Sequence, residues 1–444
     1  MNEKKRKLIG FDYVFIVLVG LLYFGWSRHL LQSWAPDEGM RSAVGFWIAE
    51  NGKLPFGDEP ELINEIWGFS YAFLPYLTSL IGALFIKGTS LVTTDIVTLY
   101  LAQRLVSVVA GMGTAFFALK IGKRVFHNRI TDYMFASFIC LLPQFVFLCS
   151  YFNNDSFSVF IAMMILFFWI SGLQDGWNAK NTVGLGIGIG LCALTYYNAY
   201  GYILCSIIIY VFSWIKKGEK FQTKEFFRWG MMIACVAIAI GGWYFVRNAI
   251  LYNGDFLGIQ TTRACGEIHA MEEYKPSNRS TLYNQGLPIT RLLLSRGWVV
   301  GVLESFVGSF RYLDVTISTT YIIIYYLILV IGAMVGLIWM MKKRETRLLA
   351  VSLLATIIIP CCLIVYSSYA SDYQPQGRYI MSALPAASLF ASNGYEKISK
   401  DKKKWIRNIF IGSILAVWII LFVLTFTNYI YPYCWCLDTR QILN

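Results

Sequence analysis

Charged residues are scarce in this chain of 444 residues. Asp, Glu, Lys and Arg together make up 14% of it, against about 25% in a typical soluble domain. Hydrophobic residues make up 57%, and the mean hydropathy is +0.54. So few charges cannot cover the surface of a water-soluble fold, and no soluble domain stands out at either end. The composition therefore predicts an all-α polytopic membrane protein, with residues 1–444 forming a single integral membrane domain.

Histidine is rarer still, and neither histidine nor cysteine forms a metal-binding pattern. The three histidines are scattered along the chain, and most of the ten cysteines lie in apolar runs, where cysteine behaves as a small hydrophobic residue. Three cysteines lie in polar segments: Cys265, Cys434 and Cys436. On an oxidising side of the membrane these have the option of a disulfide, and the sequence leaves a disulfide and free thiols both open.

Internal repeats and low-complexity tracts are absent as well. A secondary transporter more often shows interrupted helices in matching positions of two halves, so this absence counts against transport without excluding it. The formal net charge of +12 does not indicate nucleic-acid binding. An excess of Lys and Arg is expected in the cytoplasmic loops of a membrane protein.

What the chain does contain is a series of apolar runs long enough to cross a bilayer, which takes about 20 residues. The first run follows a basic segment and has no small-residue cleavage site, so we expect it to be retained as a span. The stretch 182–216 is short for the two spans assigned to it. The eleven runs are 10–32, 98–121, 131–150, 155–173, 182–199, 200–216, 229–247, 317–341, 348–369, 378–395 and 407–430.

Basic residues between the runs indicate their orientation. With eleven spans and a cytoplasmic N-terminus, every basic cluster falls on the cytoplasmic side, as the positive-inside rule requires. The outer side is then slightly acidic, and the C-terminus is extracytoplasmic. The clusters are Lys4–Lys7, Lys120–Arg129, Lys216–Arg228, Lys342–Arg347 and Lys397–Arg407.

The apolar run Tyr71–Leu91 is the exception to this pattern. Counting it as a span would move the later basic clusters outside, so we predict that it lies in the outer interface as an amphipathic or re-entrant element. Pro75 within the run suits an interrupted helix. The chain would then have two long outer loops, residues 33–97 with interfacial helices and residues 248–316.

Two adjacent carboxylates, Asp37 and Glu38, follow the first span within the stretch Trp34–Arg41. An acidic pair at a membrane surface is costly unless it faces water or a substrate. One such carboxylate can take a proton from an acceptor hydroxyl or amine, and a second can orient the acceptor or bind a divalent cation. The alternative is an ordinary polar loop after a membrane span.

Further polar residues fall on the same outer side. Arg378 and Arg247 lie at span ends, at the depth of a lipid phosphate, which an arginine holds through two parallel hydrogen bonds. The alternative is that each of these arginines only anchors its span in the lipid headgroup layer. Arg41 lies close to the acidic pair. Asn154 and Asp155 open the fourth span, where they are either ligands or a helix cap.

Several of these motifs, in this order, resemble the GT-C superfamily of membrane glycosyltransferases. The shared features are an acidic pair opening the first outer loop, interfacial helices before the second span, a short second outer loop with an Asp, and a basic turn after a span opened by Arg-Leu. More narrowly, the chain is similar to the bacterial family called domain of unknown function 2142. The motifs that carry the likeness are Trp34–Glu38, Arg104-Leu105, Gly122–Phe126, Asn153–Asp155, Gly242–Asn248, Leu251–Gly258 and Gln376–Tyr379.

The resemblance implies an inverting transfer of a sugar from a polyprenyl-phosphate-linked donor to an extracytoplasmic acceptor, a cell-surface glycan or a lipid. Asp37 would then be the general base, and Glu38 would position the acceptor. Asp155 would assist or bind a metal, and Arg378 would hold the donor phosphate. Whether a divalent cation lies near Asp37 and Asp155 stays open, because carboxylates can also form a site without a metal.

One position departs from the pattern of that superfamily. Many members carry a lysine near the phosphate in a Leu-Thr-Lys sequence after the fifth span, whereas this chain has Leu194-Thr195-Tyr196. Either another cation, such as Arg247, replaces that lysine, or the donor is held differently.

Two other functions stay open. A transporter or flippase of lipid-linked saccharides would move its substrate without forming a glycosidic bond, and charged residues buried in mid-span would favour it. A non-catalytic membrane protein of envelope assembly would tolerate substitution of Asp37 and Glu38.

The eleven-span topology predicts where an inserted tag is accessible. A tag after Lys343 should react only from the cytoplasmic side, and a tag after Tyr373 only from outside. Labelling of intact cells and of inverted vesicles with an impermeant reagent measures this, and the reverse accessibility would contradict the count of eleven.

Overall fold

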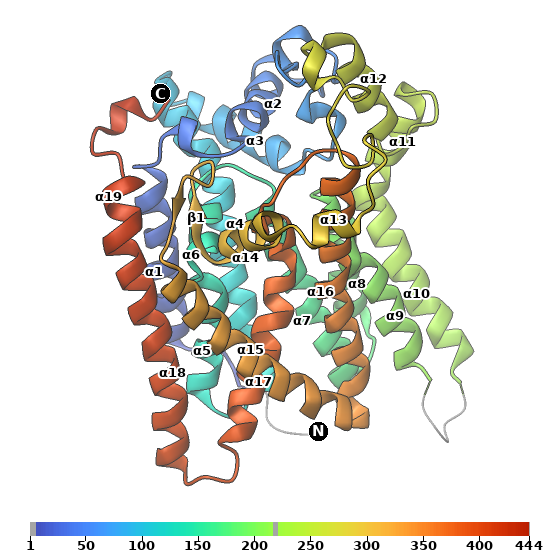
Figure 1. The fold of residues 1–444 in the computed structure, drawn as a ribbon. Helices are drawn as coiled ribbons and strands as arrows, with labels where there is room; N and C mark the ends of the chain where they lie inside the picture. Colours follow the sequence, from blue (N-terminus) through green and yellow to red (C-terminus); the bar gives the residue numbers. More distant parts are fainter. Residues whose placement is uncertain (1–5, 216–220, 444) are drawn as a thin grey trace.

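The computed structural model describes residues 6–215 and 221–443 (Figure 1). Lys4, Lys5 and the part of the third basic cluster at 216–220 lie outside these ranges. Helices dominate the described chain. Its only sheet is a two-stranded antiparallel ribbon of β1 (Ser309–Phe310) and β2 (Val315–Thr316). The prediction of an all-α polytopic fold is therefore confirmed.

Seven helical segments of the described chain are long and apolar enough to cross a membrane. A pair of helices bent by 62°, α5 (Arg129–Cys140) and α6 (Pro143–Ser150), makes an eighth if it counts as one span. The seven are α1 (Gly10–Ser27), α4 (Ile96–Val125), α7 (Asp155–Asp175), α10 with α11 (Thr223–Ala237 and Trp243–Leu251), α15 (Thr319–Lys342), α16 (Arg344–Ala370) and α18 with α19 (Lys404–Thr425 and Tyr431–Tyr433).

All eleven predicted runs coincide with helices. The remaining three are α8 (Ala179–Ala193), α9 (Tyr200–Ser213) and α17 (Leu384–Ile398), each 14 or 15 residues long. At 1.5 Å per residue such helices measure about 22 Å, less than the roughly 30 Å of a hydrocarbon core. The stretch 182–216 is thus two short helices joined by residues 194–199. That all eleven runs cross the bilayer stays a prediction.

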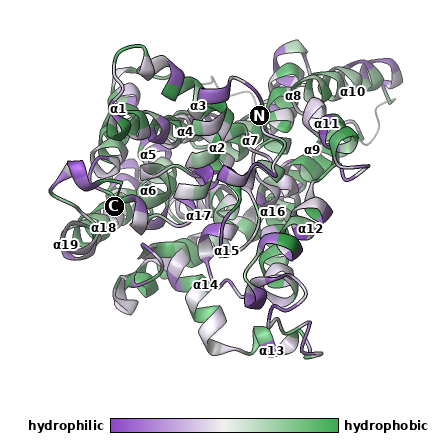
Figure 2. Ribbon diagram, turned by 90° about the horizontal axis from the view of Figure 1, so that it is seen from above, coloured by the Kyte–Doolittle hydropathy of each residue, from purple (hydrophilic) through white to green (hydrophobic). Residues whose placement is uncertain are grey.

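Large hydrophobic side chains cover the outside of the bundle. Phe11, Leu18, Ile238 and Met334 are each more than half exposed. Apolar surface on this scale is unfavourable in water and favourable in lipid. Figure 2, which looks down on the bundle, shows hydrophobic residues along most of the helices.

The two ends of the bundle differ. The upper end in Figure 1 carries α2 (Glu38–Asn51), α3 (Leu77–Ser90) and α12 (Ile259–His269). At the lower end are the turns from α15 to α16 and from α17 to α18, which hold two of the basic clusters. This arrangement agrees with the predicted orientation, which remains a prediction.

The run Tyr71–Leu91 is divided in the structure. A short turn at Tyr71–Phe73 precedes α3, which has 14 residues and packs against α2 and α4. A helix of this length is too short to span a bilayer without help. That this element lies in the outer interface stays a prediction.

Helices α15 and α17 touch backbone to backbone at three glycines. A Cβ on Gly336 would lie 1.9 Å from the carbonyl oxygen of Phe390, and a Cβ on Gly394 would lie 1.9 Å from that of Gly332. Only residues without side chains permit such an approach. Because α17 continues directly from the segment Gly377–Ala383, this contact also fixes the position of that segment.

This contact predicts a large effect of one methyl group. Gly336→Ala should lower stability by about 1–3 kcal/mol, because α15 must move away from α17. Gly412→Ala in α18, where no atom lies within 4 Å of the new Cβ, is the matched control and should be neutral or slightly stabilising. Thermal unfolding of both purified variants in detergent measures the difference, and equal stability would contradict the packing described.

Candidate active site

Asp37 lies where the chain enters α2, and its backbone is left-handed, with φ of 63°. Asp and Asn tolerate this conformation better than most residues. Its Oδ2 accepts a hydrogen bond from Nη2 of Arg378 at 2.5 Å, and 29% of the side chain remains exposed. Burial alone would raise the pKa of Asp37, but Arg378 and Arg41 outweigh burial and lower that pKa. Asp37 is therefore an ionised, partly accessible carboxylate at neutral pH.

Arg378 reaches Asp37 from the segment before α17, 341 positions along the chain. Gly377 makes this approach possible, because a Cβ there would lie 2.2 Å from the backbone nitrogen of Phe306 in α14 (Arg296–Gly308). The Gly377 amide donates to the hydroxyl of Ser305 in the same helix at 2.7 Å. The glycine thus seats the segment on α14 and directs Arg378 toward the first outer loop.

The Arg378 guanidinium is buried and makes two contacts besides Asp37. It donates to the hydroxyl of Tyr379 at 3.0 Å and to the carbonyl of Pro36 at 3.4 Å. Its Nε is buried and has no hydrogen-bond partner among the described residues. Arg378 therefore keeps one donor unused at the centre of the site.

Asp155 joins this pair from the first turn of α7. Its side chain is buried, and the charges of Arg378, Arg41 and Asp37 are the ones that act on it most strongly. The cap of α7 is supplied by Asn153, whose Oδ1 accepts the amide of Ser156 at 2.9 Å. Asp155 is consequently not needed as a cap, and its carboxylate belongs to the same cluster as Asp37 and Arg378.

Arg41 lies one helical turn after Asp37, and only 5% of it is exposed. Its guanidinium carbon lies 4.0 Å from the ring centre of Tyr71 and 5.7 Å from that of Tyr196. Across the described ranges, no hydrogen bond or ion pair joins this guanidinium to another residue. Arg41 is a buried cation held by aromatic rings alone.

Glu38 is occupied in a different contact, a buried ion pair with Arg104 of α4. Its carboxylate accepts hydrogen bonds from Nε and Nη2 of Arg104 at 2.8 and 2.6 Å, and from the amide of Phe152 at 2.7 Å. Neither charged side chain has any exposed surface. The sequence-based role of Glu38 in orienting an acceptor does not fit this geometry, because no acceptor can reach it. Glu38 instead fixes the start of α2.

Asn154 and Arg247 also stand apart from the cluster. Asn154 donates to the carbonyls of Thr195 and Pro75 at 3.1 and 3.3 Å, so it joins two loops to α7. Arg247 donates to the carbonyl of Pro55 at 2.5 Å, and it is not among the charges that act most strongly on Asp37. The expectation that Arg247 replaces the lysine absent at Tyr196 is not supported by this placement.

The cluster offers a divalent cation few ligands. Within residues 6–215 and 221–443, no three His, Cys, Asp or Glu side chains come together in a group that could hold a metal ion. Asp37 and Asp155 share their surroundings with Arg378 and Arg41, and two cations oppose the approach of a third, doubly charged one.

All ten cysteines are described, and all are free thiols.

Sequence reasoning missed the aromatic part of the site. Tyr71 and Tyr196 flank Arg41, and Tyr379 contacts Arg378. Tyr312, at the tip of the β1–β2 ribbon, lies within electrostatic reach of Asp37. Tyr196 was noticed only as a departure from a motif. Tyr379 ends the motif Gln376–Tyr379, and nothing in the local sequence marks Tyr71 or Tyr312 as site residues among the 28 tyrosines.

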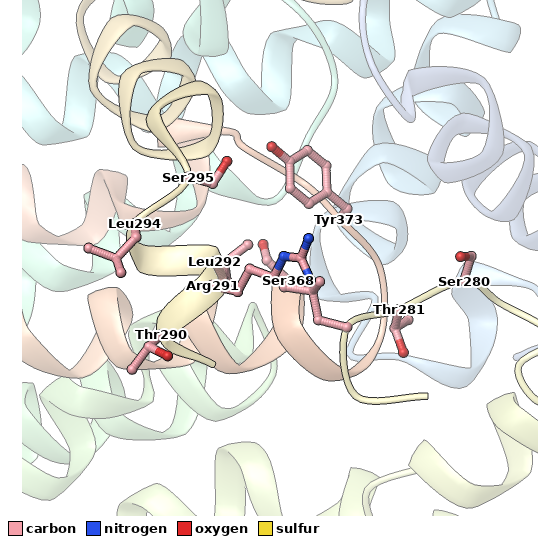
Figure 3. Close-up of a pocket in the computed structure, with 10 residues that line it drawn as sticks. Ser280, Thr281, Thr290, Arg291, Leu292, Leu294, Ser295, Ser368 and Tyr373 are labelled. Atoms are coloured by element: carbon pink, nitrogen blue, oxygen red, sulfur yellow. The ribbon is translucent and has the colours of Figure 1, made fainter. Parts of the chain in front are cut away.

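A cavity of about 670 Å³ opens beside the segment that leads to Arg378 (Figure 3). Its walls come from the second long outer loop, which includes α13 (Thr290–Leu293), and from the end of α16. Tyr373 lines the cavity, and its neighbour Gln374 accepts a hydrogen bond from Tyr379, the partner of Arg378. Figure 3 shows Arg291 and Tyr373 among the lining side chains. The cavity is thus connected to the cluster through residues 373–379.

The helical bundle and its outer loops have the GT-C fold. The crystal structure of ArnT from Cupriavidus metallidurans bound to undecaprenyl phosphate matches with a TM-score of 0.52 at 15% identity, over 92% of this chain and 64% of that one. The oligosaccharyltransferase AglB from Archaeoglobus fulgidus, in complex with an inhibitory peptide and a dolichol-phosphate, matches with a TM-score of 0.55 at 13% identity, over 93% and 55%. The chain thus spans less than two thirds of the length of either structure, and at these identities the likeness concerns the fold alone.

The chain belongs to the family of predicted membrane proteins DUF2142, whose profile matches residues 64–387. Asp155, Tyr196 and Arg378 fall inside the matched range, whereas Asp37 and Arg41 precede it. No curated protein matches the chain. The resemblance to this family is confirmed, and the fold is the one that the resemblance to the superfamily implies.

The buried ion pair with Arg104 predicts that Glu38, unlike Asp37, has a structural role. Glu38→Gln should lower the free energy of unfolding by about 3–5 kcal/mol, because Arg104 then keeps a buried charge without a counterion. Denaturant unfolding of the purified protein in detergent measures this. Glu61→Gln, at an exposed position of the same loop, is the control and should unfold like the wild type. A Glu38→Gln protein as stable as the control would contradict the structural role.

Proposed function

We propose that this protein transfers a sugar from a polyprenyl-phosphate-linked donor to an acceptor at the outer face of the membrane. The observation that carries the proposal is the meeting of one ionised, partly exposed carboxylate, Asp37, with two buried arginines, Arg378 and Arg41. The carboxylate suits a general base, and the arginines suit a phosphate. Two structures of the same fold, ArnT and AglB, hold undecaprenyl phosphate and dolichol-phosphate.

The proposed reaction is a single displacement at the anomeric carbon of the sugar. An acceptor hydroxyl or amine attacks this carbon from the face opposite the phosphate. The new glycosidic bond forms as the bond from the anomeric carbon to the phosphate oxygen breaks, and the electron pair stays on the departing polyprenyl phosphate. Asp37 takes the acceptor proton. The configuration at the anomeric carbon is inverted.

Arg378 connects the base with the leaving group. It pairs with Asp37 in the structure, and a phosphate bound beside it would share its charge. As the guanidinium shares its charge with a phosphate, Asp37 loses part of its counterion and its pKa rises, so it becomes a stronger base. Binding of the donor phosphate would in this way activate Asp37.

The acceptor, a cell-surface glycan or a lipid, would approach from the outer loops. The cavity lined by Tyr373 and Arg291 provides hydroxyl and guanidinium groups that suit a ligand rich in hydroxyls. The link from Tyr373 in its wall through Gln374 and Tyr379 to Arg378 supports this route.

A transporter and a purely structural protein would each need features that differ from those of a transferase. Several buried charges of the spans lie near their ends, where Asp12 of α1 pairs with Lys123 of α4 at 2.9 Å and Asp132 of α5 pairs with Arg6 at 2.6 Å. These pairs join α1, α4, α5 and the segment before α1, so their charges have a structural role. A flippase would still move lipid-linked saccharide after loss of Asp37, and a scaffold would keep its phenotype.

The proposal predicts that Asp37→Asn abolishes transfer and leaves the fold intact. Asn accepts the left-handed conformation at this position and keeps a hydrogen-bond acceptor for Arg378, but it cannot take a proton. We expect a loss of about 100-fold or more, in line with removal of a general base. The assay supplies radiolabelled sugars on undecaprenyl phosphate to protein-containing vesicles and measures release of undecaprenyl phosphate together with labelled product.

Asp58→Asn is the matched control, because Asp58 is an exposed carboxylate of the same outer loop. It should transfer sugar at the wild-type rate. Wild-type transfer by Asp37→Asn would refute the role of the base. Movement of labelled donor across the membrane without a new glycosidic bond would refute the transferase itself.

A further inference from the structure

Arg41 is the part of the cluster to which the proposed reaction gives no step of its own. It is 95% buried, and within the described part of the chain its guanidinium has neither a hydrogen-bond acceptor nor an ion-pair partner. A guanidinium carries five donors. The nitrogens of Arg41 are not among the fully buried side-chain atoms without a partner, so these donors face accessible space. A residue of this kind is stable in a fold that binds an anion there.

The other buried arginines have the polar partners that the Arg41 guanidinium lacks. Arg104 is satisfied by the Glu38 carboxylate and by the carbonyls of Ser27 and Leu30 at 2.6 and 2.7 Å. Arg378 has Asp37 as its counterion and leaves only Nε unused. The same site therefore contains two independent vacancies, the whole Arg41 guanidinium and the Arg378 Nε.

The surroundings of Arg41 hold it in one orientation. The ring of Tyr71 lies 4.0 Å from the guanidinium carbon, and the ring of Tyr196 lies 5.7 Å from it. Contacts with ring faces fix a guanidinium without using its N–H groups. The planar edge that remains is the one that binds two phosphate oxygens at once.

Charge decides which ligand fits. Asp37 is neutralised by its contact with Arg378, whereas Arg41 is paired with no carboxylate, although Asp37 and Asp155 act on it at longer range. A cationic ligand would be repelled by the guanidinium, and a neutral ligand would supply hydrogen-bond acceptors but no countercharge. A phosphate supplies both.

We propose that Arg41, in contact with the rings of Tyr71 and Tyr196, is the principal phosphate-binding residue of the site. This assignment rests on the proposed function and deepens it, since it names the cation that binds the donor phosphate. Arg41, next to Tyr196, thereby takes the place expected for Arg247. The shared chemistry is a phosphate monoester or diester, carried by a lipid or free in solution.

Binding measured by native mass spectrometry of the full-length protein in detergent tests this assignment. The probes are undecaprenyl phosphate, undecaprenol as the same chain without phosphate, and inorganic phosphate as a competitor. Arg41→Met should weaken binding of undecaprenyl phosphate by about 10- to 100-fold, as expected for loss of one bidentate charged contact, and should leave undecaprenol unaffected.

Two further variants complete the series. Arg41→Lys should bind with intermediate affinity, because lysine keeps the positive charge but lacks the planar guanidinium that forms two parallel hydrogen bonds. This variant replaces Arg41→Met in the test if Arg41→Met does not fold. Arg247→Met should bind like the wild type. Undiminished binding by folded Arg41→Met, or an equal loss in Arg247→Met, would overturn the assignment. If inorganic phosphate competes with undecaprenyl phosphate and the competition requires Arg41, the site recognises phosphate itself. If inorganic phosphate does not compete while binding of undecaprenyl phosphate still requires Arg41, the site recognises the phosphate of the lipid.

A double substitution tests the position of the charge. Lysine at 196 would bring an ammonium close to the place of the lost guanidinium, so Arg41→Met/Tyr196→Lys should recover part of the affinity. No recovery, with the double variant folded, would contradict the proposed location. If the wild type shows Arg41-dependent binding but no sugar transfer, the transferase fails and the phosphate site stands. If transfer is intact in Arg41→Met with unchanged affinity, the phosphate site fails and the transferase stands.

Discussion

The ion pair between Arg104 and Glu38 is the contact on which the outer end of the bundle depends. It joins the end of α1, the start of α2, the first third of α4 and Phe152, which precedes α7. Five hydrogen bonds make up this contact, two between the side chains and three to backbone groups. Two charges removed from water are tolerated only when their donors and acceptors are used. The pair therefore allows little freedom in the position of the neighbouring Asp37, or of Asp155 three residues after Phe152.

The three buried arginines form a series from structure to function. Arg104 is fully satisfied within the protein and acts as a support. Arg378 is satisfied in part, and its remaining donor lies in the site. Arg41 is held only by Tyr71 and Tyr196. The stability of the fold and the capacity to bind an anion are thus divided among residues of the same type, according to how many of their donors the protein itself occupies.

The sequence located the helices well because apolar runs and basic clusters are local properties. Each of the eleven runs is helical, and the interruption near Pro75 is present. The site was harder to predict, because its residues differ only through distant partners. Asp37 and Glu38 are adjacent, and what separates a free carboxylate from a buried one is Arg104, 66 positions after Glu38. Arg247 and Arg378 both lie at span ends, yet one contacts Pro55 and the other Asp37.

The separation of Asp37 and Arg378 along the chain has a consequence for biosynthesis. The two residues are 341 positions apart, so the carboxylate and Arg41 are inserted at the membrane long before Arg378 leaves the ribosome. During that interval Asp37 lacks its main counterion. The site closes only when the segment before α17 docks on α14, which makes this late docking step the point at which a nascent chain becomes competent.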